Sequence, residues 1–400
     1  MTSEWRTIRA ADFIDFNPRL SLKKGDIATK VAMDKLKPFT KKIPETEKAE
    51  FNGGAKFCNG DTVMARITPC LENGKTAYVD MLDDGEIGFG STEFIVMRAK
   101  TGISDPQFVY YTAINPVFRN VAIKSMVGSS GRQRVQQSVL EELELSVPDL
   151  EEQRRIGAFL ARIDEKIALN DRINDNLEQQ LRTIFKAEFT DNPELEKMTQ
   201  IPLSELCHVV TKGTTPTTLG KPFVESGINF IKAESILADH SLDKSKFAFV
   251  DEETNALLKR SVIHAGDVVF TIAGTLGRFA LIDNNVLPAN TNQAVAIIRA
   301  DAEKILPEYI YTCFIGEWHT DYYAKRIQQA VQANLSLTTI KSLPIPVLDK
   351  AKMDEYLRLI LPLIKAIKGN EAQNEKLAAL RDTLLPKLMS GEIDVSAIKL

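Results

Sequence analysis

The residues best suited to chemistry are Arg132, Gln133 and Arg134, which directly follow the stretch Gly128-Ser129-Ser130-Gly131. A guanidinium group suits phosphate or guanine, and a primary amide suits adenine. Glycine and serine predict mobile backbone beside these groups, and Ser129 adds a hydroxyl. This cluster therefore predicts a nucleic-acid contact. The alternative interpretation is that the same side chains are solvated surface groups.

A second polar cluster lies about 200 residues later in the sequence. It begins at Lys325-Arg326-Ile327-Gln328-Gln329 and continues to Gln332. Other candidates for nucleic-acid contact are further basic or hydroxyl side chains in each half of the sequence. In the first half they are Lys23, Lys24, Lys41, Lys42 and Arg66, and in the second half Lys212, Thr214, Thr215, Lys232 and Arg278.

Fragments that imitate catalytic signatures are incomplete. Asn115-Pro116-Val117-Phe118 lacks the second proline of the Asn-Pro-Pro-Phe tetrapeptide with which amino-methyltransferases hold a flipped adenine, and no glycine-rich cofactor loop accompanies it. Pro148-Asp149 followed by Asp164-Glu165-Lys166 imitates a nuclease pattern, but Asp164 falls in a predicted helix and not on a strand. The four histidines lack metal-ligand spacing, and there is no Walker loop. We therefore predict no catalytic residue and no metal site.

Composition is that of a globular protein with real cores, at 44% hydrophobic and 26% charged residues. Four scattered cysteines suggest neither a disulfide framework nor a zinc site. The start lacks a secretory signal, and no apolar run is long enough for a bilayer, so we expect a cytoplasmic protein without membrane contact. The net charge of −4 argues against a broad basic coat but allows local basic patches.

The polar clusters must be positioned by longer elements, of which two long segments are the clearest. Glu152–Glu188 and Asp354–Met389 share one heptad pattern at an offset of 200, with apolar residues in alternating steps of four and three. A helix of about 35 residues spans roughly 50 Å. That length exceeds what one small domain covers, so we expect the two helices to cover each other. The alternative is a long surface helix in each of two unrelated domains.

Two asparagines interrupt the apolar stripe at the same place in each segment, which predicts antiparallel pairing. A slipped register would leave a buried amide facing leucine. One layer is poor, because Ile163 faces Arg381, and we expect Leu380 to replace the arginine there. The predicted asparagine pairs are Asn170 with Asn374 and Asn174 with Asn370.

The globular parts are duplicated as well. Gly60-Asp61-Thr62-Val63 returns as Gly266-Asp267-Val268-Val269, each predicted to be a turn that enters a buried strand, and EFIVMRA (93–99) returns as AVAIIRA (294–300). Helices are predicted at Phe108–Asn115 and Tyr309–Gln329. The copies differ most at Asn17–Phe51 and Gly213–Ser261, which suggests two sites of one type with different targets.

The fold class predicted is α+β: two repeated mixed α/β domains separated by two long helices in an antiparallel coiled coil. The boundaries are 1–150 for the first domain, 151–190 for the first helix, 191–348 for the second domain, 349–390 for the second helix and 391–400 for a tail. Pro362 should kink the second helix or mark its first turn, and Pro386 should bend or end it.

Two stretches resemble the specificity subunit of type I restriction–modification systems. They are Val147-Pro148-Asp149-Leu150-Glu151-Glu152-Gln153-Arg154-Arg155-Ile156, and Leu380-Arg381-Asp382-Thr383-Leu384-Leu385-Pro386-Lys387 continuing through Ile393. Gly213–Pro216 (GTTP) is similar too. Asp349–Met353 departs from the family pattern, which expects a second EEQ-like entry there.

The resemblance implies two target recognition domains that each read half of a split, asymmetric site in double-stranded DNA, with the helices fixing the unread gap. Such a subunit is not itself an enzyme and holds no cofactor. It would hold two modification subunits, which bring S-adenosylmethionine and flip out adenine, and two restriction subunits, which use ATP and Mg²⁺. Two alternatives stay open: a self-contained DNA adenine methyltransferase, and a protein-binding scaffold.

Overall fold

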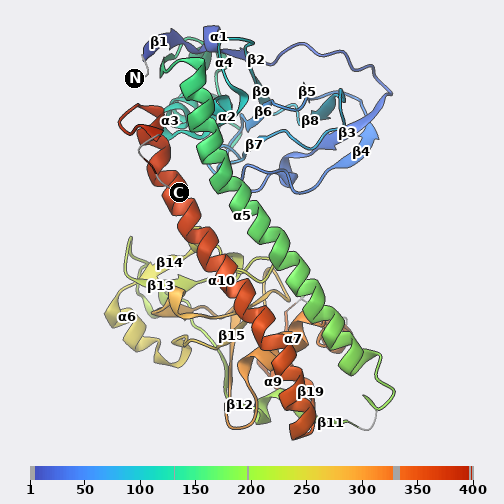
Figure 1. Ribbon diagram of the computed structural model, residues 1–400. Coiled ribbons are helices and arrows are strands. Elements are labelled where there is room, and N and C mark those ends of the chain that lie inside the picture. Colours follow the sequence, from blue (N-terminus) through green and yellow to red (C-terminus); the bar gives the residue numbers. More distant parts are fainter. Residues whose placement is uncertain (1–4, 130, 196–197, 328–333, 396–397, 399–400) are drawn as a thin grey trace. The chain divides into compact units, whose positions relative to one another are not determined.

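The computed structural model describes residues 1–400 except 1–4, 130, 196–197, 328–333, 396–397 and 399–400 (Figure 1). The chain forms two compact units. Unit 1 consists of Met1–Asn170 and Gln373–Leu400, and unit 2 consists of Asp171–Ala372. Each unit therefore contains one part of each long helix, α5 (Leu150–Phe185) and α10 (Lys350–Met389). Among the described residues, no helix combines the length and apolar composition of a membrane span.

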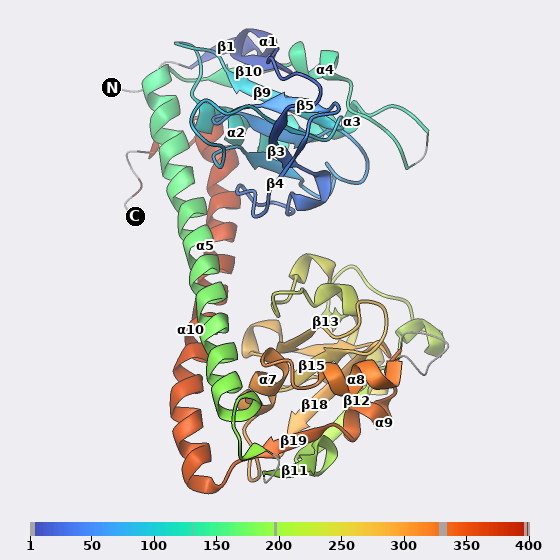
Figure 2. The same ribbon diagram turned by 90° about the vertical axis from the view of Figure 1, so that its right-hand side faces the viewer.

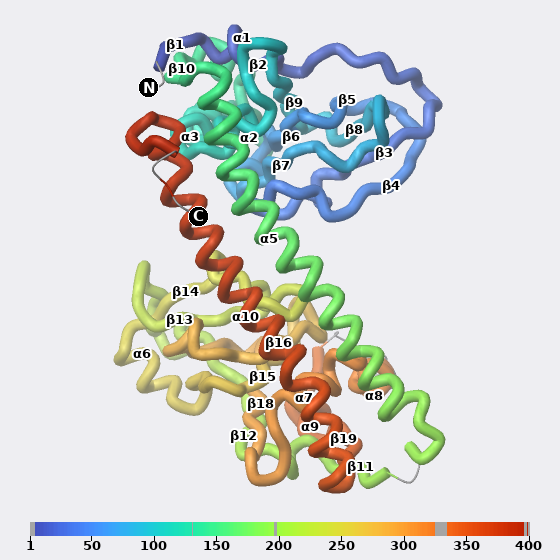
Figure 3. The backbone as a smooth tube through the Cα atoms, in the orientation of Figure 1, coloured from blue at the N-terminus to red at the C-terminus, as the bar shows by residue number. Residues whose placement is uncertain are grey.

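Unit 1 is built on a four-stranded antiparallel sheet in the order β2 (Ile14–Phe16), β9 (Phe94–Ala99), β6 (Thr62–Ala65), β7 (Thr76–Tyr78). A second, mixed sheet has the order β4 (Glu47–Glu50), β3 (Ile27–Val31), β8 (Gly88–Gly90), β5 (Ala55–Phe57). β1 (Arg6–Arg9) pairs with β10 (Glu144–Val147). The short helices are α1 (Ala10–Phe13), α2 (Pro106–Ile114), α3 (Pro116–Lys124) and α4 (Gln137–Glu141). Figure 3 follows the long excursion from β2 through β3, β4 and β5, in blue, on the side away from α5.

The central strands β6 and β9 are mostly apolar, Thr62 and Arg98 being the exceptions, because both faces of the sheet are buried over most of their length. On β6, Met64 belongs to the core shared with α2 and α5, whereas Val63 belongs to the core between the two sheets. On β9, Met97 and Val96 divide in the same way. α2 lies between this sheet and α5 (Figure 1), so the layers are helix, sheet and sheet.

Unit 2 repeats the topology of the central sheet, as the duplication predicts, whereas its mixed sheet has three strands in place of four. Its antiparallel sheet has the order β12 (Cys207–Lys212), β18 (Val295–Ala300), β15 (Val268–Thr271), β16 (Phe279–Leu281). Its mixed sheet has the order β14 (Ala248–Val250), β13 (Ile228–Ile231), β17 (Ala289–Thr291), and β11 (Thr199–Pro202) pairs with β19 (Pro344–Val347). The helices are α6 (Glu252–Leu257), α7 (Pro307–Ile315), α8 (Thr320–Ile327) and α9 (Leu337–Lys341), and Figure 2 shows α7 and α8 beside β15 and β18.

The repeated Gly-Asp pair has a structural role in both units. The Asp61 carboxylate accepts from the backbone N–H of Cys58 at 2.8 Å and makes two bonds of 2.7 Å to the Arg98 guanidinium. Asp267 makes the same contacts with His264 and Arg299. The buried carboxylate thus closes the turn before the strand and fixes it to the neighbouring strand. The predicted turn into a buried strand is confirmed.

The long helices run antiparallel, in the register predicted from the asparagines. In unit 1, Asn170 Nδ2 donates to Asn374 Oδ1 at 2.8 Å, and Leu160 and Leu385 share one core. In unit 2, Asn370 Nδ2 donates to Asn174 Oδ1 at 2.8 Å. Also in unit 2, the ring centroids of Phe189, just after α5, and Tyr356, near the start of α10, are 5.5 Å apart.

The layer that contains Arg381 differs from the prediction. Leu380 does not replace the arginine, because Leu380 is 42% exposed and Arg381 is 5% exposed. Arg381 Nη1 instead contacts Asp164 Oδ1 at 2.7 Å, and the Tyr111 hydroxyl donates to Asp164 Oδ2 at 2.5 Å. Two opposite charges and a hydroxyl satisfy one another inside the core of unit 1.

The single continuous helix predicted over Tyr309–Gln329 is wrong, because a turn separates α7 from α8. The last two residues of that prediction, 328 and 329, lie outside the described residues. A Cβ on Gly316 would meet the ring of Phe185 at 2.0 Å, and Glu317 has a φ of 60°. The turn lets Trp318 Nε1 donate to the Pro344 carbonyl at 2.6 Å. α10 begins at Lys350, so Pro362 does not mark its first turn, and α10 ends at Met389, just beyond Pro386.

Cysteines at positions 170 and 374 should form a disulfide on mild oxidation, because the register places their α-carbons within about 7 Å. Mass spectrometry of proteolytic peptides measures the yield. The matched control is the pair Asn170→Cys with Asn370→Cys. Efficient cross-linking of the control pair would mean parallel helices and would contradict the register.

Arg381→Ala should destabilise unit 1 by about 3–5 kcal/mol, because it leaves the buried Asp164 carboxylate without its counter-charge. Urea unfolding monitored by circular dichroism measures the loss. Asp382→Ala is the control, since Asp382 is an exposed partner of the same arginine and should cost at most about 1 kcal/mol. Equal losses for the two variants would show that Asp164 does not depend on Arg381.

Candidate nucleic-acid interface

Several strand ends meet at one edge of the central sheet of unit 1, here called the loop edge. Because β9 is antiparallel to both β2 and β6, and β6 to β7, this edge holds the C-terminal ends of β2 and β6 and the N-terminal ends of β9 and β7. The connections at this edge start at Asn17 and Arg66 and end at Glu93 and Lys75. Unit 2 has the equivalent loop edge, since its strands pair in the same order.

The loop that carries Arg132, Gln133 and Arg134 folds onto the loop edge. The backbone N–H of Thr68 donates to the Gln133 carbonyl at 3.0 Å, and Arg66 Nη2 donates to the Val135 carbonyl at 3.1 Å. Arg66 is therefore occupied in holding this loop. The predicted cluster does lie with the other loops of this edge.

The two arginines of this loop differ in their freedom. Arg134 makes a bidentate contact with Glu93, with Nη2 at 2.6 Å and Nε at 2.9 Å from carboxylate oxygens. This hydrogen bond and the positive charge hold the pKa of the Glu93 carboxyl below its usual range. Arg132 is exposed and makes no side-chain hydrogen bond or ion pair to any described residue. Arg132 is thus the cation of the loop that remains available, and Ser129 beside it is exposed too.

The predicted GTTP loop lies at the loop edge of unit 2. A Cβ on Gly213 would lie 1.8 Å from the Thr291 carbonyl oxygen, so only glycine allows this close approach of two backbones. The Thr215 N–H donates to Gln293 Oε1 at 3.1 Å. Lys212 is exposed at the end of β12, and Thr214 is partly exposed.

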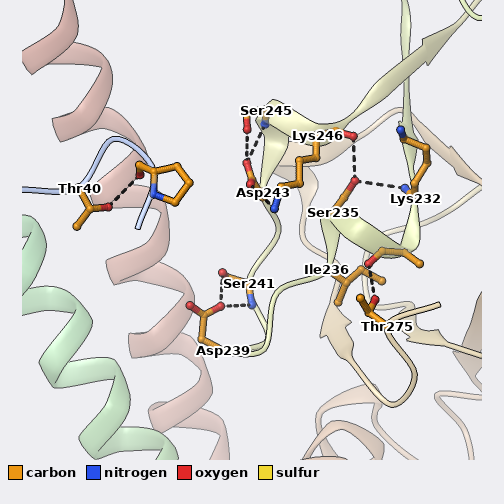
Figure 4. Close-up of polar contacts among 12 residues, drawn as sticks. Thr40, Lys232, Ser235, Ile236, Asp239, Ser241, Asp243, Ser245, Lys246 and Thr275 are labelled. Atoms are coloured by element: carbon orange, nitrogen blue, oxygen red, sulfur yellow. Dashed lines mark hydrogen bonds and ion pairs between the residues drawn. The ribbon is translucent and has the colours of Figure 1, made fainter. Parts of the chain in front are cut away.

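Lys232 and Arg278 come from neighbouring connections at the same edge. Lys232 Nζ pairs with Glu234 at 2.7 Å, and its backbone N–H donates to Ser235 Oγ, which in turn donates to the Lys246 carbonyl (Figure 4). Arg278 Nη1 donates to the Ile236 carbonyl at 3.1 Å. The guanidinium therefore fixes the loop after β13 to the loop before β16.

The remaining predicted contacts fall elsewhere. Lys23 and Lys24 are exposed in the turn before β3, and Lys42 pairs with Asp80 after β7. Lys325 and Arg326 belong to α8, but their side chains are outside the described part of the structure. Gln328 and Gln332 lie outside the described residues.

Lys41 is buried, which the sequence did not indicate. Its ammonium donates to Gln107 Oε1, lies 3.4 Å from the Tyr111 hydroxyl and 5.2 Å from the ring centroid of Tyr78. Burial lowers the pKa of Lys41 to about 8, although Asp164 counteracts part of this effect. We therefore assign Lys41 to packing.

The fragments that imitate catalytic motifs have structural roles. Asn115 caps α3 by accepting from the Val117 N–H at 3.1 Å, and Phe118 is 1% exposed. Asp149 caps α5 by accepting from the Glu152 N–H at 2.9 Å. Asp164 lies 15 residues further along α5, roughly 22 Å away at 1.5 Å per residue. These two carboxylates cannot share a metal ion.

Sequence reasoning missed Glu93 and Gln293, which orient Arg134 and Thr215. Glu93 immediately precedes β9, and Gln293 lies two residues before β18. Their positions near the N-terminal ends of the repeated strands were the available signal, although the two are not equivalent in the repeat.

Comparison with known proteins gives a consistent result. The type I restriction modification DNA specificity domain matches the chain twice, over residues 3–179 and 196–377. The Type I restriction enzyme HindI specificity subunit of Haemophilus influenzae is 23% identical over 418 residues, which cover 84% of this chain and 86% of that protein. The MjaVIII specificity subunit of Methanocaldococcus jannaschii is 21% identical and covers 98% of this chain and 93% of that protein.

A more similar relative matches over a shorter stretch. The EcoAI specificity subunit of Escherichia coli is 31% identical over 154 residues, which cover 37% of this chain and only 26% of that protein. Among solved structures, the type I restriction–modification S subunit from M. genitalium matches with a TM-score of 0.54 and 16% identity over 96% of both chains. That similarity supports the fold.

The stability of unit 1 should rise between pH 8 and about 10 because of Lys41. The folded-state pKa of about 8 lies below the ordinary 10.5, so between these values the unfolded state binds more protons and stability increases with pH. Lys41→Met lacks this titration. The stability of the wild type minus that of Lys41→Met should therefore increase by about 2 kcal/mol from pH 7.5 to 10.

Urea unfolding at each pH measures this difference, and the variant cancels the titration of the tyrosines around Lys41. A difference that stays constant over this range would contradict the buried position of the ammonium.

Proposed function

The chain belongs to the type I restriction–modification DNA specificity family, and from this membership and the two loop edges we propose that it is the DNA-recognition subunit of a type I restriction–modification complex. The proposal is that each unit reads one half of a bipartite, asymmetric site in double-stranded DNA. The subunit itself is not an enzyme and lends its specificity to catalytic partners.

The observation that carries the proposal is the repeated loop edge. In both units, one framework presents exposed cationic or hydroxyl side chains from loops that differ in sequence, such as Arg132 in unit 1 and Lys212 with Thr214 in unit 2. A common framework supports a common mode of binding. Different loops support different bases, which makes the site asymmetric.

The helix pair supports a role in setting the gap between the half-sites. α5 has 36 residues and α10 has 40, and each contributes to the cores of both units. At 1.5 Å per residue they are long enough, at roughly 50 Å, to bridge half-sites one DNA turn of about 34–36 Å apart. We propose that the length of the helix pair determines the number of unread base pairs between the half-sites.

The catalytic chemistry belongs to the partners in this proposal. Two modification subunits would bring S-adenosylmethionine and methylate one adenine in each half-site, and two restriction subunits would use ATP and Mg²⁺ for translocation and cleavage. In this proposal the chain itself binds none of these groups. Because the target is DNA, the complex would act in the cytoplasm.

Mapping methylated adenines in a genome that carries this chain tests the proposal directly. It predicts one bipartite motif with two different half-sites and a fixed gap. The motif should disappear when this chain is deleted. Persistence of the motif would assign recognition to another protein.

Arg132→Ala should weaken DNA binding by the complex of this chain with its modification subunits. Loss of one phosphate contact lowers the slope of log affinity against log salt by about 1, and loss of a bidentate base contact costs about 1–3 kcal/mol. Fluorescence anisotropy with a labelled duplex over a salt series measures both effects.

Arg9→Ala is the charge-matched control, because Arg9 is exposed on β1 and paired with Glu142. It should leave both quantities unchanged. Absence of duplex binding by the wild-type complex at every salt concentration would instead indicate a protein-binding scaffold.

A further inference from the structure

Lys41 fills a specific pocket of unit 1. Its ammonium lies 5.2 Å from the ring centroid of Tyr78 of β7 and 5.1 Å from that of Tyr111 of α2. The ammonium donates to Gln107 and is attracted by Asp164 and Glu165 of α5 and by Asp80. Lys41 comes from the long excursion between β2 and β6, which is where the two units differ most in sequence.

The equivalent position in unit 2 is a pocket of about 370 Å³ between the sheet, α7 and α10. The repeat fixes the correspondence, because the N–H of Gly60 donates to the Val79 carbonyl and the N–H of Gly266 donates to the Ile282 carbonyl, both at 2.8 Å. Residues that surround Lys41 in unit 1 therefore have equivalents in unit 2 that line this pocket. Tyr78, Asp80, Gln107 and Asp164 correspond in order to Leu281, Asp283, Glu308 and Ile364.

The pocket suits a long aliphatic chain with a positive end. Leu281, Ile282 and Ile364 form an apolar wall, and Asp283 and Glu308 supply carboxylates. Glu308 stands where the Gln107 amide accepts from Lys41, so the acceptor has become an anion.

The basic residues of the pocket do not neutralise it. Of Lys365 and Lys368, which also line it, Lys368 is paired with Glu371 at 2.9 Å. Glu371 itself does not line the pocket, and its pairing with Lys368 leaves the carboxylates Asp283 and Glu308 facing Lys365 among the lining side chains.

We propose that this pocket of unit 2 binds the side chain of a lysine from a partner polypeptide, in the way that the equivalent pocket of unit 1 binds Lys41. The lysine stem packs on the apolar wall and the ammonium pairs with Glu308 and Asp283. The inference rests on the proposed function, in which the partner is a modification subunit. The pocket of unit 1 is therefore filled by a lysine of the same chain, and the pocket of unit 2 by a lysine of the partner.

Butylammonium chloride, the lysine side chain as a free molecule, tests the chemistry of the pocket. In the full chain with ¹³C-labelled isoleucine methyl groups, it should shift the resonances of Ile282 and Ile364 saturably. It should bind about tenfold more tightly than 1-butanol, because a charged donor strengthens the hydrogen bonds, and more tightly still than butyrate. Glu308→Gln should remove most of the preference over 1-butanol. Equal binding of the three probes, or unmoved resonances, would overturn the proposal.

Lys41→Ala provides the matched control in unit 1. The substitution empties the equivalent pocket, so butylammonium should raise the melting temperature of this variant more than that of the wild type. Failure to do so would show that the two pockets are not equivalent, which would overturn the argument.

Assembly with purified modification subunits tests the partner. Glu308→Lys places a cation at the pocket and should weaken assembly at least about tenfold, as one lost charge-assisted contact does. Glu303→Lys, a charge reversal in the loop before α7, is the control and should assemble normally. Gln107→Lys, at the equivalent place in unit 1, is not a suitable control because Lys41 already fills that pocket. Normal assembly of Glu308→Lys would overturn the inference. Failure of the proposed function would instead appear as wild-type complexes that assemble but do not bind DNA.

Discussion

The structure depends on the crosswise pairing of four asparagines between α5 and α10. Leucine and isoleucine at heptad positions would allow several registers of similar stability. The amide pairs Asn170 with Asn374 and Asn174 with Asn370 select one, because any slip would leave an amide without its partner. Each unit contains one of these pairs, so the register is fixed in both.

The long helices also contribute residues to the hydrophobic core of each unit, so each unit folds together with its part of the helix pair. Leu160 and Leu385 belong to the core of unit 1, and Leu181 and Ile360 belong to that of unit 2. Neither helix is an accessory on a finished domain. The core of each unit therefore includes residues from both long helices.

Much of the framework could be predicted from the sequence, since it follows periodicity and repetition. The heptads and their asparagines give the antiparallel register, and Gly-Asp before an apolar run gives the turn into β6 and β15. Polar pairs that are distant in sequence could not be predicted this way. Arg381 interrupts an apolar stripe, and the stripe alone favours Leu380 in that layer. The buried position of Arg381 depends on Asp164, which lies 217 positions away on another helix and is not indicated by the heptad pattern.

The candidate interface was less predictable than the fold. Arg132 and Lys212 are exposed at the loop edges, whereas Lys41 is buried among tyrosines and Arg66 holds a loop. Residue type alone does not separate these cases, because lysine and arginine serve packing and surface recognition equally well. The separation needs the topology, which shows the strand ends that meet at one edge.

Removing one heptad from α5 and the facing heptad from α10 tests the central claim most directly. Seven residues shorten the helix pair by about 10.5 Å and nearly preserve its facing, which corresponds to about three base pairs of 3.4 Å. Mapping of methylated adenines should then show the same two half-sites separated by a correspondingly shorter gap. Changed half-site bases with an unchanged gap would contradict the role assigned to the helices.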